Sequence, residues 1–135
     1  MTTPDASGSP RLQHYIDSMG AVPHAISSMF AMDTAFAEHY TDIRELIYAD
    51  REGGLSLAHK ELLLVMFDLA VSQVEGGKNH LAAARRAGLT KAELNDALLI
   101  AFLVLGVSGW GKVGCHLWDA WTDWEAAENN TKDES

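Results

Sequence analysis

The chain has 135 residues, a length that fits one domain able to bury most of its apolar surface without metal or disulfide cross-links. Ten Lys and Arg residues against 19 Asp and Glu give a formal net charge of −9, which argues against nucleic acids and anionic membranes as partners because both require basic surfaces. The single cysteine, Cys115, excludes an intrachain disulfide and is consistent with a reducing cytoplasm.

Both ends of the chain are polar and predict disordered tails, over residues 1–10 and 128–135. The first tail lacks the apolar core of a signal peptide. The longest apolar run, residues 97–107, is shorter than the roughly 20 residues that a bilayer span requires. We therefore expect a soluble, cytoplasmic protein with one helical domain over residues 11–127.

Helical spacing begins near Pro23, a residue typical of a first helical turn, and this helix should run through Ala31. A second helix restarts at Asp33 and carries apolar residues every three or four positions up to Gly53-Gly54. Ser56 then precedes a long helix.

The pattern predicts that Gly76-Gly77 interrupts this long helix, which resumes through His80 and stops at Gly88. Thr90 and Glu93 form the capping-box pattern that opens a further helix, from Lys91 to about Val107.

The helix after Thr90 is apolar on nearly every face, so it should be central in the core or buried between subunits. A last helix is expected over residues 112–127, where Trp118 and Trp121 could face a partner chain. No segment alternates as a strand would. The sequence therefore predicts an all-α bundle of five to seven helices that forms a homo-oligomer.

Several kinds of site have no pattern in this sequence. No pair of the six histidines has the close spacing of a helical zinc motif. There is no glycine-rich phosphate loop after a strand and no nucleophile elbow. We expect no metal and no organic cofactor.

Titratable residues gather in the segment 55–99. Glu61 lies in an otherwise apolar stretch, Asp68 follows two helical turns later, and His80 lies beyond the two glycines. Taken alone, these residues fit a solvated helix face and a hydrogen-bonded core histidine better than they fit a catalytic site.

The order of residues in this segment adds a further observation. LSLAHKELLL is followed by a helix to a histidine and then by the pattern A-x-x-A-G-L-T-x-x-E-L. This arrangement resembles the carboxymuconolactone decarboxylase / alkylhydroperoxidase D-like family over roughly residues 20–120. In the peroxidase branch a Glu, a Cys-x-x-Cys pair and a His follow at set intervals. Glu61 and His80 match that register, whereas Gln73 and Gly76 stand at the two cysteine positions.

The resemblance implies a Glu61–His80 proton relay in a shared pocket, and the missing cysteines make a dithiol peroxidase unlikely because no thiol electrons are available. What remains is general acid–base work. The expected function is that of a cofactor-free lyase or decarboxylase, or a related isomerase, acting on a small carboxylated or lactone-type metabolite. Gln73, Gly76 and Trp110 are the expected substrate-binding residues. The alternative is a non-catalytic family member that binds a small molecule or serves in assembly.

Overall fold

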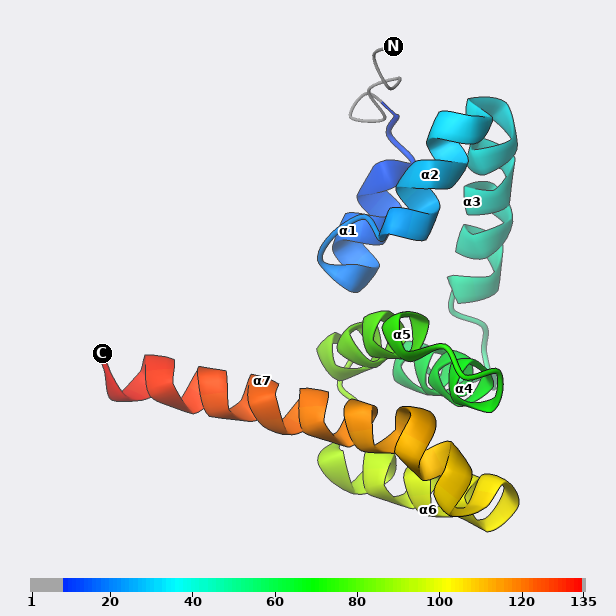
Figure 1. Cartoon of the computed structure of the whole chain (residues 1–135). Helices are drawn as coiled ribbons and strands as arrows, with labels where there is room; N and C mark the ends of the chain where they lie inside the picture. Colours follow the sequence, from blue (N-terminus) through cyan, green and yellow to red (C-terminus); the bar gives the residue numbers. More distant parts are fainter. Residues whose placement is uncertain (1–8, 135) are drawn as a thin grey trace. The chain divides into compact units, whose positions relative to one another are not determined.

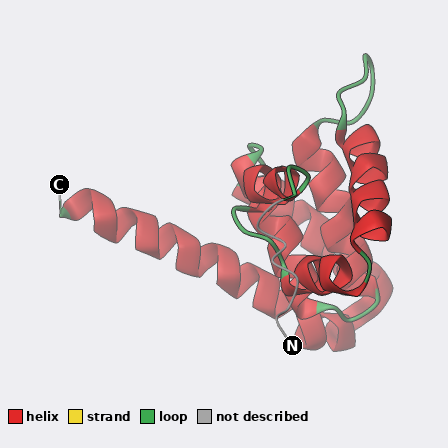
Figure 2. Cartoon of the chain, turned by 90° about the horizontal axis from the view of Figure 1, so that it is seen from above, coloured by secondary structure: helices red, strands yellow, loops and turns green. Residues whose placement is uncertain are grey.

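The computed structural model describes residues 9–134, and every regular element in that range is a helix (Figures 1 and 2). The α-helices are α1 (Leu12–Met19), α2 (His24–Met32), α3 (Thr34–Tyr48), α4 (Leu57–Ala70), α5 (Val74–Arg86), α6 (Lys91–Gly109) and α7 (Cys115–Asp133). A π-helical turn, η2 (Trp110–Gly114), joins the last two. The predicted all-α class is confirmed.

Contacts divide the chain into two units, residues 1–57 and 58–135, where the sequence was interpreted as one domain. The first unit contains α1 to α3 around buried Leu12, Tyr15, Phe30 and Ala37. The Tyr15 hydroxyl bonds the Thr41 hydroxyl at 2.8 Å and so satisfies a polar group in that core.

The second unit holds α4 to α7 and every candidate site residue. Its core consists of small and aliphatic side chains with one tryptophan: Ala58, Val65, Leu69, Leu81, Ala84, Leu89, Leu94, Leu98, Val113, Leu117 and Trp121. All four helices and η2 contribute to this cluster. This shared core fixes the position of α4 and α5, the two helices that carry Glu61 and His80, relative to α6 and α7.

The break between α4 and α5 lies at residues 71–73, and the prediction that Gly76-Gly77 interrupts the helix was wrong. Ser72 has a left-handed φ of 62°, and the Gln73 N–H donates to the Asp68 carbonyl at 2.8 Å. Both glycines lie inside α5. A Cβ at either position would meet a neighbour, the Asp68 carboxylate at Gly76 and Leu117 at Gly77. They therefore mark close packing rather than a helix end.

The capping box before α6 forms in part as predicted. The Thr90 hydroxyl accepts from the Glu93 N–H at 3.1 Å. The Glu93 carboxylate accepts from the Thr90 hydroxyl at 3.1 Å and lies 2.7 Å from His59 Nε2. The cap thereby connects the start of α6 to the start of α4.

Beyond its first turns, α6 presents a long apolar face to the surface. Its most exposed apolar residues, at 61–86%, are Leu99, Ile100, Leu103, Val104 and Val107. This helix was expected either at the centre of the core or buried between subunits. Its exposed apolar face is not at the centre of the core.

The helical stretch Lys91–Asp133 contains an 18-residue window with a mean hydropathy of 1.8, which by length and composition could cross a membrane. This window is longer than the run 97–107 counted from the sequence. Gly106 bends it, with a φ of 64° that favours glycine. One such helix is weak grounds for a membrane span.

The last helix is longer than predicted, since α7 continues through residues 128–133, which the sequence analysis assigned to a disordered tail. A bidentate ion pair from Arg85 to Glu128 ties the start of this segment to α5 at 2.7 and 2.9 Å. The distal part of α7 extends past α4, α5 and α6 in both views (Figures 1 and 2). Of the other expected tail, residues 1–8 lie outside the described part.

Candidate active site

Glu61 and His80 meet across the turn between α4 and α5. The His80 Nδ1 lies 2.7 Å from the Glu61 Oε2, a hydrogen-bond distance. Glu61 is held on the buried side of α4 together with Val65 and Leu69, at positions one and two turns away. The sequence therefore predicted correctly that these two side chains converge.

The two members of this pair differ in their access to solvent. The Glu61 side chain is 1% exposed, whereas the His80 side chain is 18% exposed. The imidazole thus has Nδ1 directed to a buried carboxylate, which fixes the orientation of the ring and of its second nitrogen, Nε2.

Asp68 faces the second nitrogen of the same ring. Its Oδ2 lies 3.9 Å from His80 Nε2, and this oxygen is buried without a hydrogen-bond partner among the described residues. The Asp68 side chain as a whole is 24% exposed. A buried carboxylate oxygen normally accepts a hydrogen bond, so Oδ2 keeps acceptor capacity beside Nε2.

Burial raises the pKa of the Asp68 carboxyl, and the nearby His80 acts in the opposite direction as its charged neighbour. No lysine or arginine contributes to this shift. Asp68 is thus a stronger base than an ordinary aspartate when ionised and holds its proton to higher pH. From the sequence, this residue was interpreted as part of a solvated helix face. Its spacing of two turns from Glu61 is the signal that could have identified it.

Gly76 was expected to leave room for substrate, but the Asp68 carboxylate lies against it. A Cβ on this residue would lie 2.8 Å from the Asp68 Oδ2. Gly76 thereby permits the carboxylate to sit close to α5. Gln73 is exposed at the N-terminus of α5, where its backbone bonds the carbonyl of Asp68.

Trp110 packs within the core cluster of the second unit. Its ring lies 6.1 Å from that of Phe102 and directly against Gly114. These contacts are with α6 and η2, and those described for Glu61 and His80 do not include Trp110. Its expected role as an apolar wall for substrate remains a prediction.

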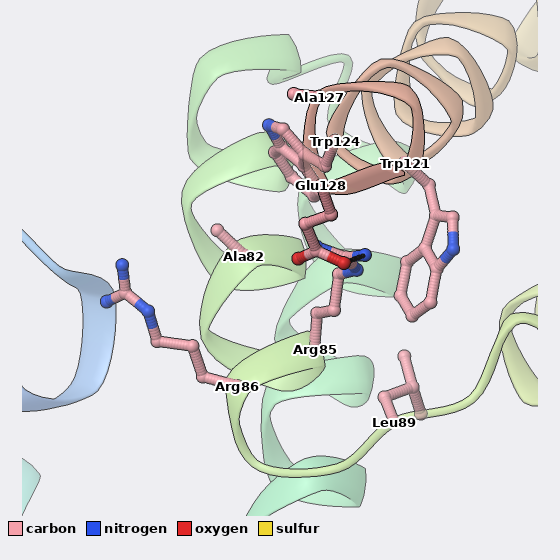
Figure 3. A pocket seen from close by; sticks show the side chains of 8 residues that line it. All are labelled: Ala82, Arg85, Arg86, Leu89, Trp121, Trp124, Ala127 and Glu128. Carbon is pink, nitrogen blue, oxygen red and sulfur yellow. Dashed lines mark hydrogen bonds and ion pairs between the residues drawn. The ribbon is translucent and has the colours of Figure 1, made fainter. Parts of the chain in front are cut away.

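A hollow of about 620 Å³ lies elsewhere in this unit, between α5 and α7 (Figure 3). It is lined by Ala82, Arg85, Arg86, Leu89, Trp121, Trp124, Ala127 and Glu128. The Arg85 guanidinium faces the Glu128 carboxylate and lies 5.1 Å from the Trp121 ring centroid, while Arg86 points away from that pair. Glu61, Asp68 and His80 do not line this hollow. Its partly buried cation, Arg85, is paired with Glu128.

Trp121 also differs from expectation. It is 4% exposed, and its N–H donates to Glu125 at 3.0 Å, so it packs in the core of its own chain rather than facing a partner. Trp118 is partly buried against the same cluster. Among residues 9–134 no three His, Cys, Asp or Glu side chains are grouped so that they could hold a metal ion; that activity needs no metal remains a prediction.

Comparison with known proteins places this geometry in a family. The model of the carboxymuconolactone decarboxylase family matches residues 34–112, which include Glu61, Asp68 and His80. A crystal structure of a Burkholderia xenovorans LB400 protein, whose name refers to the same family, superposes with a TM-score of 0.78 at 28% identity, covering 90% of this chain and 92% of that one. No curated protein matches the chain. The chain therefore belongs to the carboxymuconolactone decarboxylase family.

Proposed function

We propose that the protein is a cofactor-independent lyase, most simply a decarboxylase, that acts on a small carboxylated or lactone-type metabolite. The observation that carries the proposal is the 2.7 Å contact between a buried Glu61 carboxylate and the partly exposed His80 ring. Membership of the family supports this class of chemistry. A soluble cytoplasmic protein fits the single cysteine and the acidic composition.

In this proposal His80 donates from Nε2 to the carbonyl oxygen of the substrate, and Glu61 balances the charge on the ring through Nδ1. The bond to the carboxyl carbon breaks, CO2 leaves, and the electron pair forms the carbon–carbon double bond of an enol. The carbonyl serves as the electron sink, so the step requires no cofactor. Protonation at carbon and return of the oxygen proton complete the reaction.

The test is turnover of a panel of small lactones with and without a carboxylate, including carboxymuconolactone. Release of CO2 and exchange of carbon-bound hydrogen with D2O are followed by NMR. We expect Glu61→Gln and His80→Asn each to lower the rate on the order of 10²-fold or more. The matched controls are Glu75→Gln and His116→Asn, which replace exposed residues of the same types.

Wild-type protein dialysed against a chelator should keep its rate, because the mechanism uses side chains alone. Equal rates in the site variants and the controls would contradict the proposal. So would loss of activity on chelation with recovery on adding one divalent metal.

We further propose that the chain forms a homo-oligomer, a hexamer or a trimer, in which a second copy covers the apolar face of α6. Five aliphatic side chains there are 61–86% exposed in the single chain. Leaving them in water costs about 25 cal/mol for each Å². Leu63, Phe67 and Val71 continue the exposed apolar surface along α4, beside Asp68. A partner on this surface would lie near the site.

A further inference from the structure

We propose that Asp68 is the group that exchanges a proton with the substrate carbon, while His80, held by Glu61, bonds the oxygen of the enol or enolate. This inference rests on the proposed function and assigns the step which that mechanism leaves open. A ring with Glu61 at Nδ1 and Asp68 near Nε2 has an acceptor for a proton on each side. Two groups on the same side of the ring allow one to serve the oxygen of a carbonyl compound while the other serves its carbon.

The spacing of the two groups suits such a substrate. His80 Nε2 and Asp68 Oδ2 are 3.9 Å apart, beyond a hydrogen bond to each other but close enough to contact neighbouring atoms of one small molecule. Both side chains are partly exposed, at 18% and 24%. Asp68 Oδ2 itself is buried and has no hydrogen-bond partner among the described residues, so it keeps the capacity to bond a ligand atom held against Nε2.

Asp68 is also held at that position by its neighbours. Gly76 of α5 has no side chain to displace the carboxylate, and an added Cβ there would lie 2.8 Å from Oδ2. The same helix supplies His80 one turn later. The α5 backbone thus brings both reactive groups to one place.

Burial raises the pKa of Asp68, which makes the carboxylate a better base and its conjugate acid able to persist beside a bound anion. His80 is the charged group that acts on it directly, with Glu61 behind the ring.

The proton balance is as follows. In the exchange direction, Asp68 as carboxylate removes a proton from the carbon next to the carbonyl, and the electron pair moves to form the enolate, whose oxygen takes the hydrogen bond from His80 Nε2. In the decarboxylation direction, protonated Asp68 delivers its proton to the carbon of the enol left by CO2, the enol oxygen returns its proton to Nε2, and Asp68 recovers a proton from water.

Binding of tetronic acid tests this assignment without requiring turnover. Its anion is a five-membered enolate lactone, so it resembles the intermediate. Calorimetry at pH 8 in two buffers of different ionisation enthalpy measures the protons taken up on binding. We expect the wild type to take up about one proton more than Asp68→Asn, because ionised Asp68 must be neutralised beside the enolate.

The control is Asp96→Asn, an exposed aspartate on α6, which should bind with the proton uptake of the wild type. Equal uptake in the wild type and Asp68→Asn would place the proton on His80 and overturn the inference. Failure of the wild type to bind tetronate would overturn it too, since the site would not hold an enolate.

Turnover separates this inference from the proposed function. On a lactone that the wild type converts, Asp68→Asn should slow deuterium incorporation at carbon on the order of 10²-fold. If Glu61→Gln and His80→Asn lose activity and Asp68→Asn does not, the inference fails and the proposed function stands. If the wild type converts no lactone, the proposed function fails, and the calorimetric result still decides whether Asp68 takes up the proton.

Discussion

Glu61 and His80 are 19 residues apart in the sequence, yet a carboxylate oxygen of the first lies 2.7 Å from Nδ1 of the second. The contact exists because the chain reverses at residues 71–73, where Ser72 adopts a left-handed φ of 62°. A turn four residues later, at Gly76-Gly77, would have left His80 in another register with α4. The contact between Glu61 and His80 therefore depends on where α4 ends.

Replacing His80 by alanine should lower the free energy of unfolding by about 1–3 kcal/mol, because it removes a hydrogen-bond partner of a carboxylate that is 1% exposed. Urea denaturation at neutral pH measures the difference. His116→Ala, at an exposed position on α7, should change stability by no more than about 0.5 kcal/mol. A His80 variant as stable as the His116 variant would show that the contact adds nothing.

The stability contributed by Asp68 should fall as pH rises. Burial raises the folded-state pKa of this carboxyl above its unfolded value. Between the two values the folded chain binds more protons, so stability is fully present below the unfolded pKa and is lost as pH rises through the folded pKa. Asp68→Asn should remove this loss and be relatively more stable at pH 7 than at pH 4. Parallel pH–stability curves for the variant and the wild type would contradict the shift.

Gly76→Ala should reduce turnover while leaving the fold intact, because the new Cβ would displace the Asp68 carboxylate from a 2.8 Å approach. The matched variant is Gly111→Ala, a glycine of η2 with no atom within 4 Å of an added Cβ. Steady-state rates and circular dichroism of both proteins decide the matter. Should both retain the wild-type rate, close approach at Gly76 would not be needed for the reaction.

The apolar face of α6 should control assembly. Light scattering on a sizing column is expected to give a multiple of the 14.7 kDa chain mass, with a hexamer expected over a trimer. Leu103→Glu and Val104→Glu introduce charge at side chains that are 86% and 77% exposed, so they should yield monomers without loss of helix. Ser108→Glu, an exposed polar position on the same helix, should assemble normally. A wild-type mass equal to one chain would refute the assembly proposal.

The sequence by itself determined the helical class and the register of the pair. Apolar residues at three- and four-residue spacing specify helices because burial of one face drives them, and Thr90 marks the start of α6 through its own hydroxyl. Glu61 and His80 could be paired in advance because their spacing matched that of a known family. The match predicted that the two side chains meet, but it did not predict that the chain reverses at residues 71–73.

Only the tertiary structure decided that Asp68 belongs beside His80. Its spacing from Glu61 puts both on one side of α4, but whether that side meets water or another helix depends on how α5 returns. Likewise, Gly76 looked like a helix breaker until the carboxylate packed against it, and residues 128–133 looked like a tail until Arg85 paired with Glu128. In each case a contact between two different helices outweighed local propensity, and the helix packing that makes the contact cannot be read from either helix alone.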